Sequence, residues 1–285
     1  MIKIPVRSSF IREVGPLRWA VRTAIRQFYK RVAKRDQRMR LPTGEWITLP
    51  LSSHFASELF VTGADVDWGS EKLLAQVIDG HGAFLDVGAN IGYYSLYLAP
   101  KAAAVYSFEP DPRARKSLEV NVSGNPKITV VPVAVGANKG EAQFVLASDS
   151  EKSHLTAGSD NQANRIKVDV TTIDAFVTER DLTVECIKID AEGFDLEIIT
   201  GAMNVLLRQQ PVVLTEAGPD AALFQLTERL GYRVFAFMRD VRTRKRSYAE
   251  LFRGIPPQGA TKTVFLVPSR LVDRFKALEN SFRPR

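Results

Sequence analysis

Acidic side chains stand at the carboxyl ends of apolar runs in this chain of 285 residues. In that position a carboxylate can accept hydrogen bonds from sugar hydroxyls, pair with a cation or take a proton from a reacting hydroxyl. The carboxyl ends of parallel strands meet in one crevice, so we expect these acids to face one cleft. They are Asp86, Glu109, Asp190, Glu192 and Glu216.

A glycine-containing turn follows the first of these runs. The apolar segment Ala83–Val87 leads into Gly88 and Gly92, and a helical pattern begins at Tyr93. A residue without a Cβ can take a positive φ and lets a ligand approach the backbone. The next apolar run, Ala104–Phe108, ends before Glu109. Strand, glycine turn, helix, strand and terminal acid form the front half of a nucleoside-binding βαβ unit.

The middle of this turn indicates which nucleoside fits. A dinucleotide-binding loop has the pattern G-x-G-x-x-G, and its central glycine makes room for a pyrophosphate. Here Asn90 is central, and no glycine stands three residues after Gly92. The loop therefore favours a ligand with an amino-acid tail, whose ammonium and carboxylate could meet backbone groups, Asp86 and the Asn90 amide.

Strand and helix patterns alternate along the rest of the chain. Expected strands are 46–51, 128–135 (interrupted by Pro132), 184–189, 212–214, 232–237 and 261–267. Expected helices are 71–78, 93–99, 112–120, 194–207 and 221–230, whereas 60–63 resembles a loop. Segments 140–147 and 166–172 alternate apolar and polar residues, which indicates an antiparallel excursion. We expect an α/β fold with a doubly wound, mostly parallel sheet, an antiparallel last strand and a β excursion between strands 3 and 4.

The positive charge belongs to the N-terminal segment. Residues 1–40 contain twelve Lys and Arg against Glu13 and Asp36, a net charge of +10, and the remaining chain has a net charge of −3. Basic residues recur every four positions from Arg18 to Arg38, and apolar residues recur at helical spacing from Leu17 to Val32. We expect a basic amphipathic arm, 1–40, followed by one domain, 41–285.

Three roles for the arm remain open. Its helix could pack its apolar side on the domain, rest on an anionic membrane surface or touch nucleic acid. The mildly acidic domain argues against a nucleic-acid substrate. Cys186 is the single cysteine, and no signal peptide or apolar run of about 18–20 residues is present, which favours a cytoplasmic protein, with the inner membrane face as an alternative site through the arm.

Several motifs together resemble the FkbM family of S-adenosylmethionine-dependent methyltransferases. They cover roughly residues 58–217 in order and spacing: DVGANIGYYS at 86–95, FEP at 108–110, VAVG at 133–136, VTTID at 170–174, KIDAEG at 188–193 with Gly201, and PVVLTE at 211–216. The resemblance implies a class I methyltransferase (Rossmann-like) fold and methyl transfer to a hydroxyl, often on a sugar or secondary metabolite.

The resemblance also implies site residues. Asp86, Gly88, Asn90 and Gly92 would hold the methionine part of S-adenosylmethionine, Glu109 the ribose, and the edge at Val133 and Ala134 the adenine. Ala89, Pro110 and Asp190 complete the expected cofactor-binding set. Asp190 and Glu192 would face the reaction centre.

Charge then suggests the catalytic roles. The sulfonium loses its positive charge in the transition state, so a carboxylate beside sulfur mainly binds the cofactor. A carboxylate beside the acceptor hydroxyl helps, because that oxygen must lose its proton. We expect Asp190 to position cofactor and acceptor, and Glu192 or Glu216 to act as the base, with His54 and His154 as alternatives. A divalent cation on Asp190, Glu192 and Glu216 is conceivable, but no ligand spacing requires one.

The expected function is an S-adenosylmethionine-dependent O-methyltransferase with a saccharide or natural-product acceptor. Two alternatives stay open: a nucleotide-sugar oxidoreductase on a Rossmann-like fold, for which Asn90 is the main obstacle, and a membrane-surface binding module that uses the arm. The partners expected are a small-molecule or glycan acceptor and no nucleic acid, with peripheral membrane contact through the arm as an open option.

Overall fold

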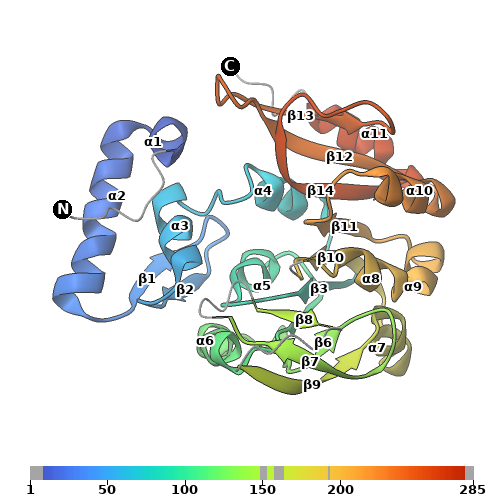
Figure 1. Ribbon diagram of the computed structural model, residues 1–285, viewed down its shortest axis with the longest axis horizontal. Helices are drawn as coiled ribbons and strands as arrows, with labels where there is room; N and C mark the ends of the chain where they lie inside the picture. The colour runs from blue at the N-terminus through green and yellow to red at the C-terminus, as the bar shows by residue number, and fades with distance from the viewer. Residues whose placement is uncertain (1–8, 148–152, 157–163, 192, 280–285) are drawn as a thin grey trace.

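A main sheet, a smaller sheet and an N-terminal lobe make up the molecule (Figure 1). The structure is a computed structural model that describes residues 9–147, 153–156, 164–191 and 193–279. The N-terminal lobe lies on one side of the main sheet, and the smaller sheet lies below it in the view of Figure 1. None of the helices in these described ranges is long and apolar enough to cross a bilayer.

The main sheet has eight strands in the order β13-β12-β14-β11-β10-β3-β4-β5. Five of them are parallel: β3 (Ala83–Val87), β4 (Ala104–Phe108), β5 (Ile128–Val131), β10 (Val184–Ile189) and β11 (Val212–Thr215). The others are β12 (Tyr232–Arg239), β13 (Arg246–Leu251) and β14 (Ala260–Pro268). Strand β14 lies between β11 and β12 and is antiparallel to both. The predicted mostly parallel sheet with an antiparallel last strand is confirmed.

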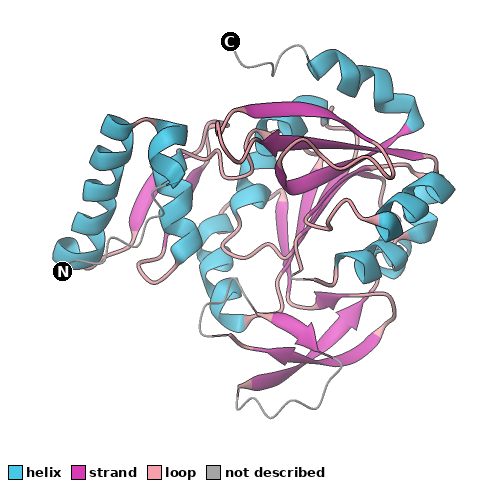
Figure 2. Cartoon of the chain, turned by 45° about the horizontal axis from the view of Figure 1, so that its top comes forward, coloured by secondary structure: helices cyan, strands magenta, loops and turns pink. Residues whose placement is uncertain are grey.

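Alternating side chains in the strands feed two apolar cores, one on each face of the sheet. In β3, Phe84 packs into one core, and Leu85 and Val87 pack into the other. Figure 2 shows the sheet between its helices. The first core includes residues of α4 (Ser70–Val77), α5 (Tyr93–Leu98), α6 (Pro112–Val122) and α11 (Val272–Glu279). The second includes residues of α7 (Ile173–Glu179), α8 (Asp195–Thr200), α9 (Met203–Arg208) and α10 (Ala221–Leu230).

The strand order reverses between β3 and β10. The chain proceeds from β3 through β4 to β5 at one edge, then returns to β10 on the other side of β3. The turn after β3 passes very close to the turn after β10. Gly88 has a φ of 74°, and a Cβ there would lie 1.9 Å from the Asp190 carbonyl oxygen. Gly88 is therefore required by backbone packing at the reversal point, where α/β sheets open a ligand crevice.

The predicted β excursion is confirmed as a second sheet of order β6-β9-β7-β8. Its strands are β6 (Ala134–Val135), β7 (Gly140–Val145), β8 (His154–Thr156) and β9 (Arg165–Thr171). The expected interruption of the run 128–135 at Pro132 is confirmed, but the two parts belong to different sheets, because β5 ends at Val131 and β6 pairs with β9. Pro132 explains the break, since it has no N–H to donate to a continuing ladder.

The N-terminal lobe contains α1 (Ser9–Val14), α2 (Pro16–Phe28), the π-helix η1 (Tyr29–Ala33), the hairpin β1 (Gln37–Arg40) with β2 (Trp46–Leu49), and α3 (His54–Thr62). The hairpin joins residues on both sides of position 40. The loop expected at 60–63 is wrong, because α3 extends to Thr62. The Ser53 hydroxyl caps this helix by accepting from the Ala56 N–H at 2.9 Å, and Gly63 ends it in the left-handed region.

The helix expected over 194–207 consists of two helices, α8 and α9. They are separated at Gly201, where a Cβ would lie 2.2 Å from the Gly136 carbonyl oxygen. Strand β13 and helix α11 were not predicted. Both have mixed polar and apolar sequences, and their partners β12, β14 and the first core decide their structure.

Candidate active site

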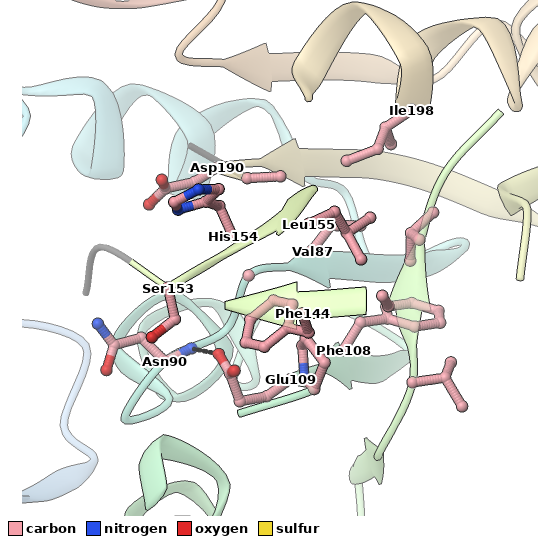
Figure 3. A pocket seen from close by; sticks show the side chains of 16 residues that line it. Val87, Asn90, Phe108, Glu109, Phe144, Ser153, His154, Leu155, Asp190 and Ile198 are labelled. Atoms are coloured by element: carbon pink, nitrogen blue, oxygen red, sulfur yellow. Dashed lines mark hydrogen bonds between the residues drawn. The ribbon is translucent and has the colours of Figure 1, made fainter. Parts of the chain in front are cut away.

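A first cavity lies between the carboxyl ends of β3 and β4 and the small sheet (Figure 3). Phe144, His154 and Leu155 line it from β7 and β8. The main sheet contributes Val87, Gly88, Asn90, Phe108, Glu109, Pro110, Asp190 and Ala191, and the segment that enters the small sheet contributes Val133, Ala134 and Val135. Ser153 and Ile198 complete the lining, so most lining residues are apolar, and the two carboxylates are those of Glu109 and Asp190.

Glu109 is fixed by two backbone donors. Its Oε2 accepts from the Asn90 N–H and its Oε1 from the Asp111 N–H, each at 2.8 Å. The first of these contacts is drawn in Figure 3. The side chain is buried, and this burial raises its pKa to about 7. Each carboxylate oxygen keeps a further lone pair, so Glu109 can still accept hydrogen bonds from a pair of ribose hydroxyls.

Two buried oxygen atoms beside the glycine turn accept no hydrogen bond from any described residue. Asn90 has a φ of 50°, and its Oδ1 has no hydrogen-bond partner within the described part of the chain. Asp86 Oδ1 is also without a hydrogen bond to any described residue, although Lys188 Nζ lies 3.9 Å away. Buried acceptors without donors are costly. An ammonium group at this turn would supply donors, so the residues fit a ligand with an amino-acid tail.

A second cavity, with a volume of about 350 Å³, lies on the other side of the same turn. It shares Gly88, Asn90 and Asp190 with the first cavity. Its remaining lining residues are Phe55, Glu58, Val66, Asp67, Asp86, Ala89, Tyr93, Tyr94, Lys188, Glu216 and Lys262. The N-terminal lobe, the turn after β3 and the ends of β10 and β11 therefore enclose it together. The two cavities meet at the three shared residues.

Lys188 lies between the carboxylates of Asp86 and Asp190, although the sequence analysis predicted no role for it. Its Nζ donates to Asp190 Oδ2 at 2.9 Å and to the Gly88 carbonyl at 3.2 Å. Burial alone would lower the pKa of Lys188, but Asp190 and Asp86 outweigh burial and raise that pKa above its usual value. Lys188 is thus a permanent cation that fixes the Asp190 carboxylate. A lysine between two isoleucines, two positions before the expected acid Asp190 in the chain segment 187–190, was the available signal.

Glu216 and Asp67 are two acids that line the second cavity. Glu216 is an exposed residue, yet the protein around its carboxylate displaces water and raises its pKa, and the charges of Asp190 and Asp67 add to this effect. Burial is also the main cause of the raised pKa of Asp67, whose Oδ2 accepts from the Tyr94 hydroxyl at 2.7 Å. Asp195 Oδ1 accepts from the Glu216 N–H at 3.1 Å and so fixes the backbone there.

The predicted site residues divide between the cavities. Gly88, Asn90, Glu109, Pro110, Val133, Ala134 and Asp190 line the first, and Asp86, Ala89 and Glu216 line the second. Gly92 lines neither, and a Cβ there would meet Leu118 Cδ1 at 2.7 Å. Glu192 lies outside the described residues. His154 lines the first cavity, whereas His54 is an exposed residue at the start of α3.

Eight lining residues of the second cavity were not predicted: Phe55, Glu58, Val66, Asp67, Tyr93, Tyr94, Lys188 and Lys262. Most of them lie outside the stretches with a recognisable pattern of acids and glycines, and the fold brings them together from distant parts of the chain. No group of three or more His, Cys, Asp or Glu in the described ranges is arranged to hold a metal ion.

The strand order, with the antiparallel strand β14 between β11 and β12, defines the class I methyltransferase fold. A family model described as the methyltransferase FkbM domain matches residues 86–244, which is more than half of the chain. The chain belongs to this family.

Individual relatives are distant. The hexuronic acid methyltransferase AglP of Haloferax volcanii is 29% identical over 141 residues, which are 47% of this chain and 56% of the relative. The chain thus spans about half the length of this curated relative. Among solved structures, a methyltransferase FkbM from Methylobacillus flagellatus is 17% identical, with 74% of this chain and 52% of that chain covered and a TM-score of 0.40. An rRNA methylase from Streptococcus thermophilus is 15% identical, with 70% and 93% covered and a TM-score of 0.39.

Proposed function

We propose that the protein is an S-adenosylmethionine-dependent O-methyltransferase that acts on a hydroxyl of an uncharged saccharide. The observation that carries this proposal is the meeting of the two cavities at Gly88, Asn90 and Asp190. One cavity combines the Glu109 carboxylate with apolar side chains, which suits a nucleoside, and the other combines carboxylates with aromatic rings, which suits a hydroxyl-rich molecule. Membership of the FkbM family supports the same assignment.

The first cavity and the turn after β3 supply the groups that would hold the cofactor. Glu109 would accept from the ribose hydroxyls, and the edge at Val133 and Ala134 would contact the adenine. Asp86 and Asn90 offer buried acceptors to the ammonium of the amino-acid tail. When bound, S-adenosylmethionine supplies an electrophilic methyl group on a positively charged sulfur.

The second cavity would bind the acceptor. Carboxylates accept hydrogen bonds from hydroxyls, and the rings of Phe55 and Tyr94 offer apolar contact to a sugar face. Both ammonium groups among the described lining residues already contact carboxylates, Lys188 with Asp190 and Lys262 with Glu58 at 2.9 Å. The described lining residues therefore offer an anionic acceptor five acidic side chains and two ammonium groups that are already paired, which disfavours its binding. We therefore expect a neutral sugar to be preferred over a hexuronic acid, the substrate class named for the relative AglP.

Two carboxylates take different parts in this proposal. Asp190 lines both cavities and is held by Lys188, so it would position cofactor and acceptor relative to each other. Glu216 lines only the second cavity, where its raised pKa suits it to take the proton of the acceptor hydroxyl. Holding the acceptor oxygen in line with the methyl group should supply most of the rate enhancement.

A transfer assay with methyl-labelled S-adenosylmethionine tests the proposal. We would incubate the full chain with neutral saccharides, amino sugars and hexuronic acids and measure label in the product after alkaline treatment. Methyl ethers survive alkali, whereas methyl esters do not, so the treatment separates O-methylation of a hydroxyl from esterification of a carboxylate. The proposal predicts alkali-stable label on a neutral sugar. Label confined to esters of hexuronic acids would contradict it.

A further inference from the structure

The helical arm is turned with its apolar side toward solvent. Five apolar side chains of α2 and η1 are exposed by 40–76%: Leu17, Val21, Ile25, Phe28 and Val32. At about 100° per residue they fall within an arc of about 80° on the helix. In Figure 1, α2 lies at the outer side of the N-terminal lobe, and its packing partners are α1, η1 and α3. Of the three alternatives from the sequence, the one in which the helix packs its apolar side on the domain is therefore wrong.

A buried arginine fixes this orientation. Arg26 is fully buried on the opposite side of α2. Its guanidinium donates to the Leu49 carbonyl at 3.2 Å, the Pro50 carbonyl at 2.6 Å and the Ser57 hydroxyl at 3.2 Å. Rotating the helix to hide its apolar side would take these donors away from three acceptors and bring other side chains against them. Such a change is strongly unfavourable, so the exposed face is a stable feature of the fold.

The charges around this face are almost all positive. Arg18 and the basic residues that follow the helix are exposed: Arg31, Lys34, Arg35, Arg38 and Arg40. Asp36 is an exposed acid in the same segment, and the carboxylate of Glu13 is buried against Arg239 and Arg246. An apolar strip about 20 Å long with basic flanks is the pattern of a helix that lies in a membrane interface.

We propose that the exposed face of α2 and η1 docks the protein on an anionic lipid bilayer. The charge pattern selects this partner. If the same face of a second copy docked here, basic flanks would meet basic flanks, and this face offers few acids to compensate for them. A nucleic acid would satisfy the basic side chains but would leave Leu17, Val21 and Phe28 in contact with a charged backbone. Anionic headgroups over acyl chains match both the charge and the apolar strip.

Vesicle co-sedimentation of the full chain tests the docking. We would compare vesicles of phosphatidylcholine alone with vesicles that contain about 30% phosphatidylglycerol, on the order of a biological anionic fraction. The proposal predicts at least about tenfold tighter binding to the anionic vesicles, and weaker binding as salt rises. The triple variant Val21→Gln/Ile25→Gln/Phe28→Gln should lose at least about tenfold in affinity, and so should Arg31→Gln/Lys34→Gln/Arg35→Gln.

A matched variant controls for the loss of apolar surface as such. Val120, Leu207 and Ile255 are comparably exposed on other elements, and the triple change of these residues to Gln should leave vesicle binding unchanged. Affinity for S-adenosylhomocysteine reports whether each variant remains folded. Equal binding of the Val21/Ile25/Phe28 variant and the unaltered chain to anionic vesicles would overturn the proposal. It would also be overturned if sedimentation velocity without lipid showed a dimer that this variant dissociates, or if an oligonucleotide bound through the same residues.

Discussion

At the scale of single residues, similar carboxylates differ in their surroundings. Glu109 is buried between two backbone N–H donors, Asp190 is paired with Lys188, and Glu216 faces a cavity together with other acids. Donors and cations stabilise the ionised form, whereas burial and like charges oppose it. These differences underlie the three roles that we propose, ribose binding for Glu109, positioning for Asp190 and proton transfer for Glu216, and each role has a distinct consequence.

The first prediction concerns Glu109. Replacing it with Ala removes the ribose acceptor and leaves the Asn90 and Asp111 N–H groups without their carboxylate. We expect S-adenosylhomocysteine to bind about 30- to 100-fold more weakly, which corresponds to about 2–3 kcal/mol for buried charged hydrogen bonds. Isothermal titration calorimetry measures this change. Glu119→Ala, at an exposed position of α6, is the control and should bind normally. Unchanged affinity of Glu109→Ala would refute the ribose assignment.

The second prediction concerns Glu216. Because its pKa is raised, Glu216 keeps its proton above the usual pH range of a glutamate and becomes a base only as the pH rises further. In the unaltered chain, kcat/KM should therefore increase with pH through neutrality. Glu216→Gln should lower kcat about 100- to 10,000-fold and abolish this pH dependence. Its affinity for S-adenosylhomocysteine should stay within about threefold.

Glu228→Gln, at an exposed position of α10, serves as the control for that series. Retention of full kcat by Glu216→Gln would show that another group takes the proton.

At the scale of elements, the turn after β3 determines where the cavities meet. Gly88 and Gly124 both have positive φ values, 74° and 86°, but only Gly88 has a backbone oxygen where its Cβ would be. Gly124→Ala should therefore destabilise the protein by about 1–2 kcal/mol through backbone strain alone. Gly88→Ala should cost more than about 4 kcal/mol, because the turns after β3 and β10 must separate. Urea unfolding compares the two variants. Similar losses in both would show that close packing at Gly88 is unimportant.

The first turn of α4 carries a buried acid, Glu71. Its Oε1 accepts from the Val66 and Asp67 N–H groups at 2.8 Å and from the Tyr93 hydroxyl at 3.1 Å, so it holds the segment that carries Asp67. Burial raises the pKa of Glu71 to about 8, and the charge of Asp67 adds to this. Between its unfolded pKa of about 4.3 and its folded pKa, the unfolded chain has lost a proton that the folded chain keeps.

The free energy of unfolding should therefore fall as the pH rises through this window, by up to about 1.4 kcal/mol per pH unit from Glu71. Glu71→Gln keeps an acceptor oxygen and should remove this contribution. Urea unfolding at about pH 5 and about pH 8, near the two ends of the window, measures the difference, with the exposed Glu119→Gln as the control. Equal pH dependence of the Glu71→Gln variant and the unaltered chain would show that Glu71 is not its source.

At the scale of the whole molecule, local patterns predicted the central sheet well. Val184–Ile189 and Ala221–Leu230 have the predicted bounds, because a continuous apolar run or a helical period leaves one way to bury the side chains. The carboxyl ends of the strands β4, β10 and β11 were also predicted to within a residue, and with them the positions of Glu109, Asp190 and Glu216. Features that depend on long-range contacts were missed, such as Lys188 among its carboxylates and Asp67 in the second cavity.

The N-terminal arm shows the same limit. Periodicity predicted helix α2, but it also suggested that the apolar stripe could pack inward. The acceptors for Arg26 are carbonyl groups of Leu49 and Pro50 and a hydroxyl of Ser57, and only the folded hairpin and α3 bring them together. A periodic pattern identifies the two sides of a helix, whereas the tertiary hydrogen bonds decide which side is buried.

The central claim is that the first cavity binds S-adenosylmethionine and not a nicotinamide dinucleotide. Isothermal titration calorimetry of the full chain with S-adenosylhomocysteine and, separately, with NAD tests it most directly. We predict a one-to-one complex with S-adenosylhomocysteine in the micromolar range, about −8 kcal/mol, and no measurable binding of NAD. Binding of NAD without binding of S-adenosylhomocysteine would contradict this claim and favour an oxidoreductase.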